Sequence, residues 1–342
     1  MTVTELKAKL KCADFDKWLI LAGEEDYLKR HYRGAIKKSV LEDDAFDMFN
    51  HSVFDGADMD IASFRDALYA PPMMSDKKLV EWRHADLDKM KESDKDALIK
   101  LAERREDYPY AVVVITSLAD GFDTGTEKKP SKLFKKLSDS FDITVFEKST
   151  DAQLLSWMKK HFDAEGISVD APTLNALLFR VGHSMQVLHE EISKLSAYAK
   201  ATGRTSINPT DVAEVCSTTV ECDAFAISNA IIEKNVEKAF LALTDMKQQR
   251  IEPYVILSQL AKTYGELLSI SLLIDEGRDA DDIAEIMKFH PYRLKLYMSA
   301  AKKIGTKRLS ESLAELVRID ASSKAGGITG YKTVEMFITK NI

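Results

Sequence analysis

The strand signals of this chain stop near residue 150, and this change constrains the fold more than any other feature. Before it, short apolar runs alternate with helical patterns; after it, only helical patterns follow. Strands that alternate with helices predict a mainly parallel sheet covered by helices on both faces. The sequence therefore predicts an α/β domain followed by helical domains. At 342 residues the chain is long enough for two or three such domains.

The first part of the chain contains five predicted strands, at 18–23, 48–56, 77–82, 110–118 and 141–147. The first of these, "WLILAG", is continuously apolar, as expected for a strand that is buried on both faces. Helices are predicted between the strands, at 26–40, 60–70, 93–105 and 130–139. In the second of these helices, Ile61, Phe64 and Leu68 recur at helical spacing.

Capping residues mark the starts of helices after residue 150: Ser149 or Thr150, Asp170 with Pro172, and Asn208 with Pro209. Between them, one apolar stripe has spacings of three and four: Met185, Leu188, Ile192, Leu195 and Tyr198. These signals predict a small helical domain at about 150–215. Amphipathic helices continue from residue 223 and predict a third, all-helical domain.

Composition excludes several classes of protein. The net charge of -7 argues against a protein coated in positive charge for nucleic acid, so any DNA contact must be local. The cysteines, Cys12, Cys216 and Cys222, form no CxxC pair, which favours a reducing cytoplasm over a disulfide framework or a zinc ribbon. The sequence does not begin with a signal-peptide pattern, and no apolar stretch approaches the ~18 residues of a membrane span. Neither secretion nor a membrane is expected.

The sequence contains no motif of a catalytic, nucleotide or metal site. The turn after the first predicted strand reads "AGEEDYLKRHYRG", without GxxxxGK[ST] and with acidic residues that would repel phosphates. Acidic residues at a helix start are typical of a simple capped connection. The histidines are scattered and form no HExxH, and there is no GxSxG. We expect no cofactor and no metal, and the sequence leaves open whether the chain is an enzyme.

Two basic stretches, 128–136 and 293–308, stand out from the acidic average. The first has five lysines in nine residues, and the second contains no acidic residue. Either could neutralise phosphates, and Tyr292 and Tyr297 could stack on bases or simply pack. Either could equally be a solvated helix face whose lysine stems cover apolar neighbours. The candidate DNA-binding residues are Arg293, Lys302, Lys303, Lys307 and Arg308.

The stretch "ALYAPPMMSDKKLV", residues 67–80, places two methionines where a polar turn is expected. Its two prolines remove backbone donors and restrict φ, so a helix that ends near Ala70 cannot continue. Met73 and Met74 are then held on a short, stiff connection. Flexible, polarizable methionine side chains suit an apolar pocket on another protein. The alternative is that both side chains fold back onto the sheet.

Seven segments resemble, in order, the delta subunit of the bacterial DNA polymerase III clamp loader: "WLILAGEEDYL", "FDG" at 54–56, "PPMMSDKKLV", "VLHEEISKLSAY", "INPTDV", "HPYRLKLYMSAAKK" and "RIDASSKAG". The resemblance spans nearly the whole chain. It implies a multidomain protein with an AAA+-like α/β clamp-interaction domain at 1–148 that does not bind nucleotide, a helical lid domain at 149–215 and a helical collar domain at 216–342. It also implies that the subunit binds and opens the sliding clamp, which is loaded on primed DNA during replication.

The same resemblance implies a clamp-binding element made of Tyr69, Pro72, Met73 and Met74. Relatives commonly carry Pro and two large apolar side chains here, often aromatic, so the methionines are a departure that keeps the apolar character. The implied partners are the sliding clamp (beta subunit), the gamma/tau and delta prime subunits through the collar, and primed DNA within the bacterial polymerase III holoenzyme. An active AAA+ ATPase, a stand-alone DNA-binding replication protein and a metabolic α/β enzyme are the alternatives.

Overall fold

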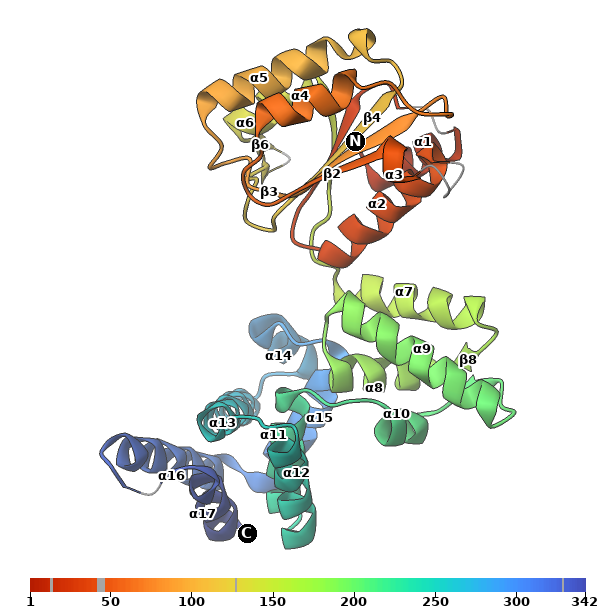
Figure 1. Ribbon diagram of the computed structural model, residues 1–342. Helices are drawn as coiled ribbons and strands as arrows, with labels where there is room; N and C mark the ends of the chain where they lie inside the picture. Colours follow the sequence, from red (N-terminus) through yellow and green to blue (C-terminus); the bar gives the residue numbers. More distant parts are fainter. Residues whose placement is uncertain (13–14, 42–46, 127, 328) are drawn as a thin grey trace. The chain divides into compact units, whose positions relative to one another are not determined.

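The computed structural model describes residues 1–12, 15–41, 47–126, 128–327 and 329–342 (Figure 1). The chain divides into two compact units, Met1–Ser149 and Thr150–Ile342. The first unit contains a parallel sheet with helices, and the described part of the second is helical apart from one short strand pair. The predicted change from α/β to helical structure near residue 150 is therefore confirmed.

A five-stranded parallel sheet forms the centre of the first unit, in the order β2-β3-β4-β1-β7. Its strands are β1 (Trp18–Ala22), β2 (His51–Asp55), β3 (Lys78–Ala85), β4 (Ala111–Ser117) and β7 (Phe141–Val145). A separate small hairpin pairs β5 (Gly125–Thr126) with β6 (Lys129–Pro130). All five predicted strands are present. Since β2 and β7 end the order, they are the two edge strands of the sheet.

Helices cover both faces of this sheet (Figure 1). One face carries α1 (Val3–Cys12) and α2 (Asp26–Val40), and the other carries α4 (Ile61–Tyr69), α5 (Glu92–Glu103) and α6 (Lys132–Ser138); a 3₁₀ turn, η2 (Arg105–Asp107), follows α5. Every residue of β1 is buried, because its side chains alternate between the two faces. Leu19 and Leu21 pack toward α2, whereas Trp18 and Ile20 pack toward α4.

The predicted strand at 48–56 begins later than expected. Residues Asp47–Asn50 form a helical turn, α3, and β2 starts at His51, which pairs with Leu79. The partner strand β3 starts at Lys78, one residue before Leu79, so Met48 and Phe49 have no neighbouring strand with which to form a ladder. The acidic end of α3 is held by an ion pair of 2.5 Å between Lys37 and Asp47.

Eleven helices make up most of the described part of the second unit: α7 (Asp151–Ala164), α8 (Ala171–Val181), α9 (Met185–Ala201), α10 (Pro209–Val215), α11 (Val220–Ile232), α12 (Val236–Gln248), α13 (Pro253–Asp275), α14 (Ala280–Met287), α15 (Pro291–Ile304), α16 (Thr306–Lys324) and α17 (Tyr331–Asn341). The strand pair joins β8 (Ser168–Val169) to β9 (Ser206–Ile207). One apolar core runs through helices α11 to α17. A backbone hydrogen bond of 2.9 Å from Thr219 to Arg180 joins these helices to α8, and the division into lid and collar at residue 215 stays a prediction.

Local capping explains where these helices begin. Thr150, not Ser149, caps α7, and it forms a capping box with Gln153. Asp170 and Asn208 cap α8 and α10 as predicted.

Among the described helices, none is by itself long and apolar enough to cross a membrane. Taken together, α10 and α11 are long and apolar enough, but the two helices are bent by 110° at their junction.

Candidate docking surface on the first unit

The two methionines lie at the surface on a loop that follows α4. The helix ends at Tyr69, and Ala70 is already extended, with φ -66° and ψ 119°. Met73 is 49% exposed and Met74 is 81% exposed. Met74 has a φ of 52°, which is uncommon for a residue other than glycine. The side chains therefore do not fold back into the core, and they are available to a partner.

Hydrogen bonds from Lys78 and Tyr110 hold the end of α4, which leads into this loop. Lys78 is buried, and its ammonium donates hydrogen bonds to the carbonyls of Ala67 (2.6 Å) and Ala70 (3.0 Å). The hydroxyl of Tyr110 donates to the carbonyl of Tyr69 at 2.9 Å. These bonds satisfy carbonyls that a helix leaves without partners at its C-terminus. Burial lowers the pKa of Lys78.

Asn50, on another segment of the chain, also holds the loop. Asn50, at the end of α3, is 2% exposed. Its Oδ1 accepts a hydrogen bond from the backbone N–H of Met73 at 2.7 Å, and its Nδ2 donates to the carbonyl of Met73 at 2.8 Å. Nothing in the sequence indicated this interaction, because Asn50 fell within a predicted strand.

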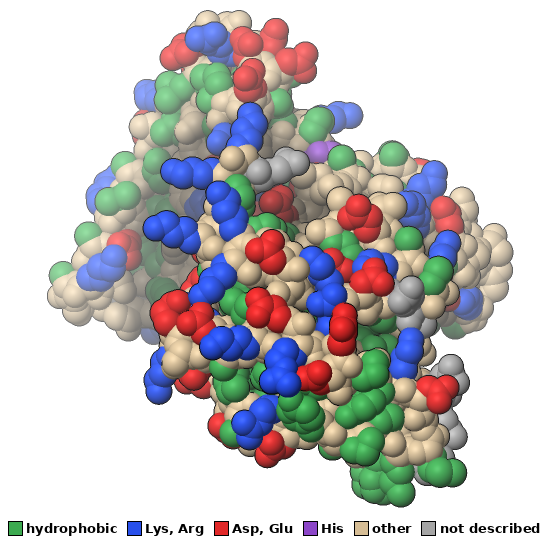
Figure 2. Space-filling model, turned by 90° about the horizontal axis from the view of Figure 1, so that it is seen from above, with side chains coloured by type: hydrophobic (Ala, Val, Ile, Leu, Met, Phe, Trp, Pro, Cys, Tyr) green, Lys and Arg blue, Asp and Glu red, His purple; other side chains and the backbone are tan. Residues whose placement is uncertain are grey.

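Tyr69 and Pro72 lie beside the two methionines. Tyr69 is exposed, and its ring packs edge-on against the ring of Tyr108, with 5.4 Å between ring centroids. Tyr108 is buried, and burial raises its pKa to about 12. Pro72 is half-buried. Figure 2 shows hydrophobic side chains gathered at one edge of the face it presents, while charged side chains are intermixed over much of the rest.

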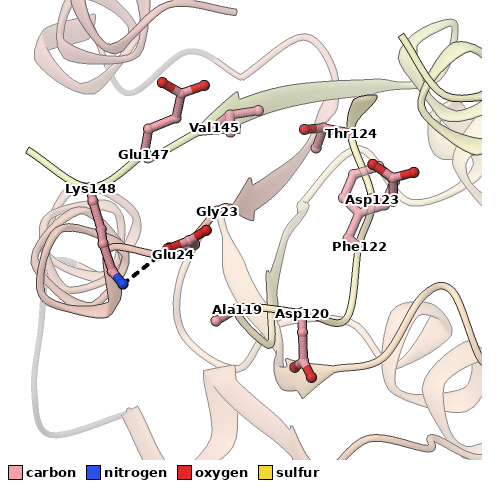
Figure 3. Close-up of a pocket in the computed structure, with 10 residues that line it drawn as sticks. All are labelled: Gly23, Glu24, Ala119, Asp120, Phe122, Asp123, Thr124, Val145, Glu147 and Lys148. Atoms are coloured by element: carbon pink, nitrogen blue, oxygen red, sulfur yellow. Dashed lines mark ion pairs between the residues drawn. The ribbon is translucent and has the colours of Figure 1, made fainter. Parts of the chain in front are cut away.

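The carboxyl edge of the sheet carries a cavity of about 530 Å³ (Figure 3). It lies where β1, β4 and β7 end, which is the edge where open α/β sheets bind ligands. Four carboxylates line it, those of Glu24, Asp120, Asp123 and Glu147. Lys148 also lines the cavity, but it forms an ion pair with Glu24 at 3.2 Å. These charges disfavour a bound phosphate.

The turn after β1 explains why no phosphate loop fits there. Gly23 has a φ of 100°, and a Cβ at this position would lie 2.3 Å from the carbonyl oxygen of Phe146. The same carbonyl accepts a hydrogen bond from the N–H of Glu25 at 3.0 Å. The Glu25 carboxylate in turn accepts from the N–H of Tyr27 at 3.3 Å and caps α2. The donors that would hold a phosphate are therefore already engaged.

The lysine nearest this turn is also engaged. Lys29 is buried in α2, and its ammonium donates to the carbonyl of Ser117 at 2.9 Å. It pairs with Asp26 at 2.8 Å. The turn is therefore a capped strand-to-helix connection, as the sequence predicted.

In the part of the chain that the structure describes, no group of three or more His, Cys, Asp or Glu side chains could hold a metal ion.

The predicted DNA-binding residues fall into two groups. Arg293 pairs with Glu221 at 2.6 Å and with Glu266 at 2.8 Å, and its guanidinium lies 4.0 Å from the ring centroid of Phe289. Arg308 donates to the carbonyl of Asn341. The exposed members of the set are Lys302, Lys303 and Lys307.

The two tyrosines at this stretch pack against other aromatic rings. Tyr297 is buried and stacks on Phe225, with 4.5 Å between ring centroids. The ring of Tyr292 meets that of Phe179 edge-on. In the other basic stretch, Lys136 forms an ion pair of 2.6 Å with Asp96, and the remaining lysines of 128–136 are exposed.

Two family models match parts of this chain. The family model for the DNA polymerase III delta subunit matches residues 19–147, and the model for the C-terminal domain of the same subunit matches residues 221–341. The DNA polymerase III subunit delta of Bacillus subtilis (strain 168) is 22% identical over 341 residues, which cover 98% of this chain and 96% of that protein.

A solved structure shows the same fold. The Bacillus subtilis DNA clamp loader delta protein (YqeN) matches with a TM-score of 0.60 and 21% identity, over 99% of each chain. The predicted order of an α/β domain followed by helical structure is confirmed, and the AAA+-like character of the first domain stays a prediction. Together the two family models cover more than two thirds of the 342 residues. The chain belongs to the DNA polymerase III delta subunit family.

Proposed function

We propose that this chain is the delta subunit of a clamp loader, which binds and opens a ring-shaped sliding clamp so that the ring can be placed on primed DNA. The observation that carries this proposal is the exposure of Met73 and Met74 on a loop held by Asn50 and Lys78. A preorganised apolar loop loses little conformational entropy when it binds. A few such side chains can supply most of the binding energy of an interface.

The proposed mechanism involves no bond-making. A subunit that binds the open ring more tightly than the closed ring shifts the ring toward opening by that difference in affinity. Each tenfold difference corresponds to about 1.4 kcal/mol. ATP binding by partner subunits would then control access to Met73 and Met74. This fits a chain in which carboxylates line the sheet edge where a nucleotide phosphate would otherwise bind.

The helical collar, residues 216–342, would join the subunit to its gamma/tau and delta prime partners, with residues 149–215 as the lid. Support comes from large apolar side chains that are exposed on these helices: Leu241, Tyr254, Leu272, Ile286 and Val317. Scattered exposed apolar residues are common, but contact with another subunit would cover them. Within the assembled loader, Lys302, Lys303 and Lys307 are the proposed DNA contacts. This function belongs in the bacterial cytoplasm, where the chromosome is replicated.

The test is a titration of the cognate sliding clamp, the ring-shaped beta subunit, against the double variant Met73→Ala with Met74→Ala. We expect affinity to fall about 30-fold or more, because truncating an interface hot spot typically costs about 2 kcal/mol or more. Val187→Ala, an exposed apolar side chain on α9, is the control and should bind like the wild type. Unchanged affinity of the double variant, at an unchanged melting temperature, would refute the proposed site.

Two of the three rival functions are disfavoured by specific contacts. An active ATPase needs free phosphate donors after β1, but the N–H of Glu25 and the ammonium of Lys29 are bound within the protein. A stand-alone DNA-binding protein needs a broad basic surface, whereas the net charge is -7 and Arg293 is held by two carboxylates.

A further inference from the structure

Two further apolar side chains are exposed close to the methionine loop. Met48 is 81% exposed and Phe49 is 53% exposed, both in α3. They immediately precede Asn50, whose side chain binds the backbone of Met73. Residues 48–49 and 73–74 are far apart in sequence, yet one buried side chain joins their segments.

The chemistry of Asn50 suits this role. A carboxamide carries a donor and an acceptor on one planar group, so it can bind both the N–H and the carbonyl of a single residue. Both bonds are made here, at 2.7 and 2.8 Å. In a buried position, loss of either partner leaves a polar group without a hydrogen bond, which is costly. Asn50 therefore fixes where Met73 lies relative to α3.

The start of α3 is held as well. Lys37 on α2 pairs with Asp47 at 2.5 Å, and His51, directly after α3, is paired with Leu79 in the sheet. The turn that carries Met48 and Phe49 is thus fixed at both ends, as is the helix end that leads to Met73 and Met74. Neither segment has to be ordered when a partner binds.

We propose that Met48, Phe49, Met73 and Met74 form one composite docking surface, and that Asn50 is the residue that positions its two halves. This inference rests on the proposed function and deepens it: the occupant is the same sliding clamp, because Asn50 joins the segment of residues 48–49 to the proposed clamp-binding loop. Phe49 adds a large aromatic side chain, and aromatic rings contribute strongly to interface burial.

Clamp affinity of full-length variants tests the proposal. Met48→Ala with Phe49→Ala should weaken binding about tenfold or more, with Val187→Ala as the unaffected control. Asn50→Ala should weaken binding about tenfold although every apolar side chain remains. Asn50→Asp keeps the acceptor for the Met73 N–H but cannot donate to the Met73 carbonyl when ionised, so it should also bind more weakly. It replaces Asn50→Ala if that variant does not fold.

A double-mutant cycle separates positioning from a general loss of stability. Added to Met73→Ala with Met74→Ala, the substitution Asn50→Ala should have little further effect on affinity, because the Met73 and Met74 side chains that it positions relative to α3 are gone. Full additivity would overturn the role of Asn50.

The remaining outcomes are distinguishable. If only the Met73 and Met74 variants bind weakly, the composite surface is wrong and the proposed function stands. If no variant binds weakly, the proposed docking site fails together with this inference. If sedimentation shows that the wild type dimerises and that Met48→Ala with Phe49→Ala prevents it, the occupant is a second copy, and the proposal is overturned.

Discussion

At the scale of single residues, Glu81 shows how the start of β2 is held. It is a carboxylate on β3 that is only 1% exposed. It binds Arg83 at 2.5 Å, and His51 Nε2 lies 3.3 Å from its other oxygen. Burial acts to raise its pKa, but the hydrogen-bonded Arg83 and the nearby His51 outweigh burial and hold the pKa below the ordinary value of 4.5. His51 directly follows Asn50, so this network lies next to the proposed docking surface.

A lowered pKa in the folded state gives a stabilising contribution above the pKa of the unfolded chain. This contribution is lost as pH falls through the folded-state pKa. We therefore expect Glu81→Gln to lower the unfolding free energy by about 1–3 kcal/mol near pH 7. The difference from the wild type should shrink below pH 4.5, the ordinary value for the group.

Urea unfolding, followed by the fluorescence of Trp18 and Trp82 in a Trp157→Phe background, measures this difference for the first unit. A difference between Glu81→Gln and wild type that stays constant from pH 7 to pH 3 would contradict the role of the buried carboxylate.

At the scale of elements, the C-terminal end of α4 depends on a side chain from a neighbouring strand. Proline explains why the helix stops, but it does not satisfy the last carbonyls. Lys78 does so for Ala67 and Ala70, and its charge also suits the negative end of the helix dipole.

The substitution Lys78→Met removes these bonds while keeping a long apolar side chain. We expect a decrease of about 1–3 kcal/mol in unfolding free energy, because the carbonyls of Ala67 and Ala70 lose their hydrogen bonds to a charged partner. Hydrogen–deuterium exchange should also become faster at the amide of Ala70, which bonds to the carbonyl of Asp66 in the wild type. Unchanged protection at Ala70 would show that the prolines alone hold the helix end.

Most element positions could be predicted because their signals are local. Thr150, Asp170 and Asn208 cap the helices that follow them, and each cap bonds within a few residues. The start of β2 was not predictable in this way. Met48 and Phe49 are apolar, as strand residues often are, and only the tertiary structure shows that pairing with β3 begins at His51.

At the scale of the whole molecule, the basic stretch of the second unit contains residues with different roles. Arg293 belongs to an internal ion-pair network with Glu221 and Glu266, whereas Lys302, Lys303 and Lys307 are exposed. The Arg293 guanidinium is already paired with two carboxylates, so it should bind a phosphate weakly. Substitution of Arg293 should therefore have a different effect from substitution of the three lysines.

We expect the triple variant Lys302→Ala, Lys303→Ala and Lys307→Ala to weaken binding of primed DNA by the assembled loader. The salt dependence should also become shallower, by about 0.9 in the log–log slope for each phosphate that the variant no longer neutralises. Arg293→Ala should instead lower the melting temperature and leave the slope unchanged. Fluorescence anisotropy at several salt concentrations measures the slopes, and thermal unfolding measures the melting temperature. Equal slopes for wild type and the triple variant would exclude these lysines as DNA contacts.

The sequence by itself determined the α/β and helical halves, most helix starts, and the presence of a stiff apolar loop at Met73 and Met74. Periodicity, capping and proline act over a few residues, so they can be read along the chain. Only the tertiary structure decided that Asn50 binds Met73, that Met48 and Phe49 are exposed on the turn before Asn50, and that Arg293 is held by Glu221 and Glu266. Those interactions join residues far apart in sequence, and folding alone brings them together.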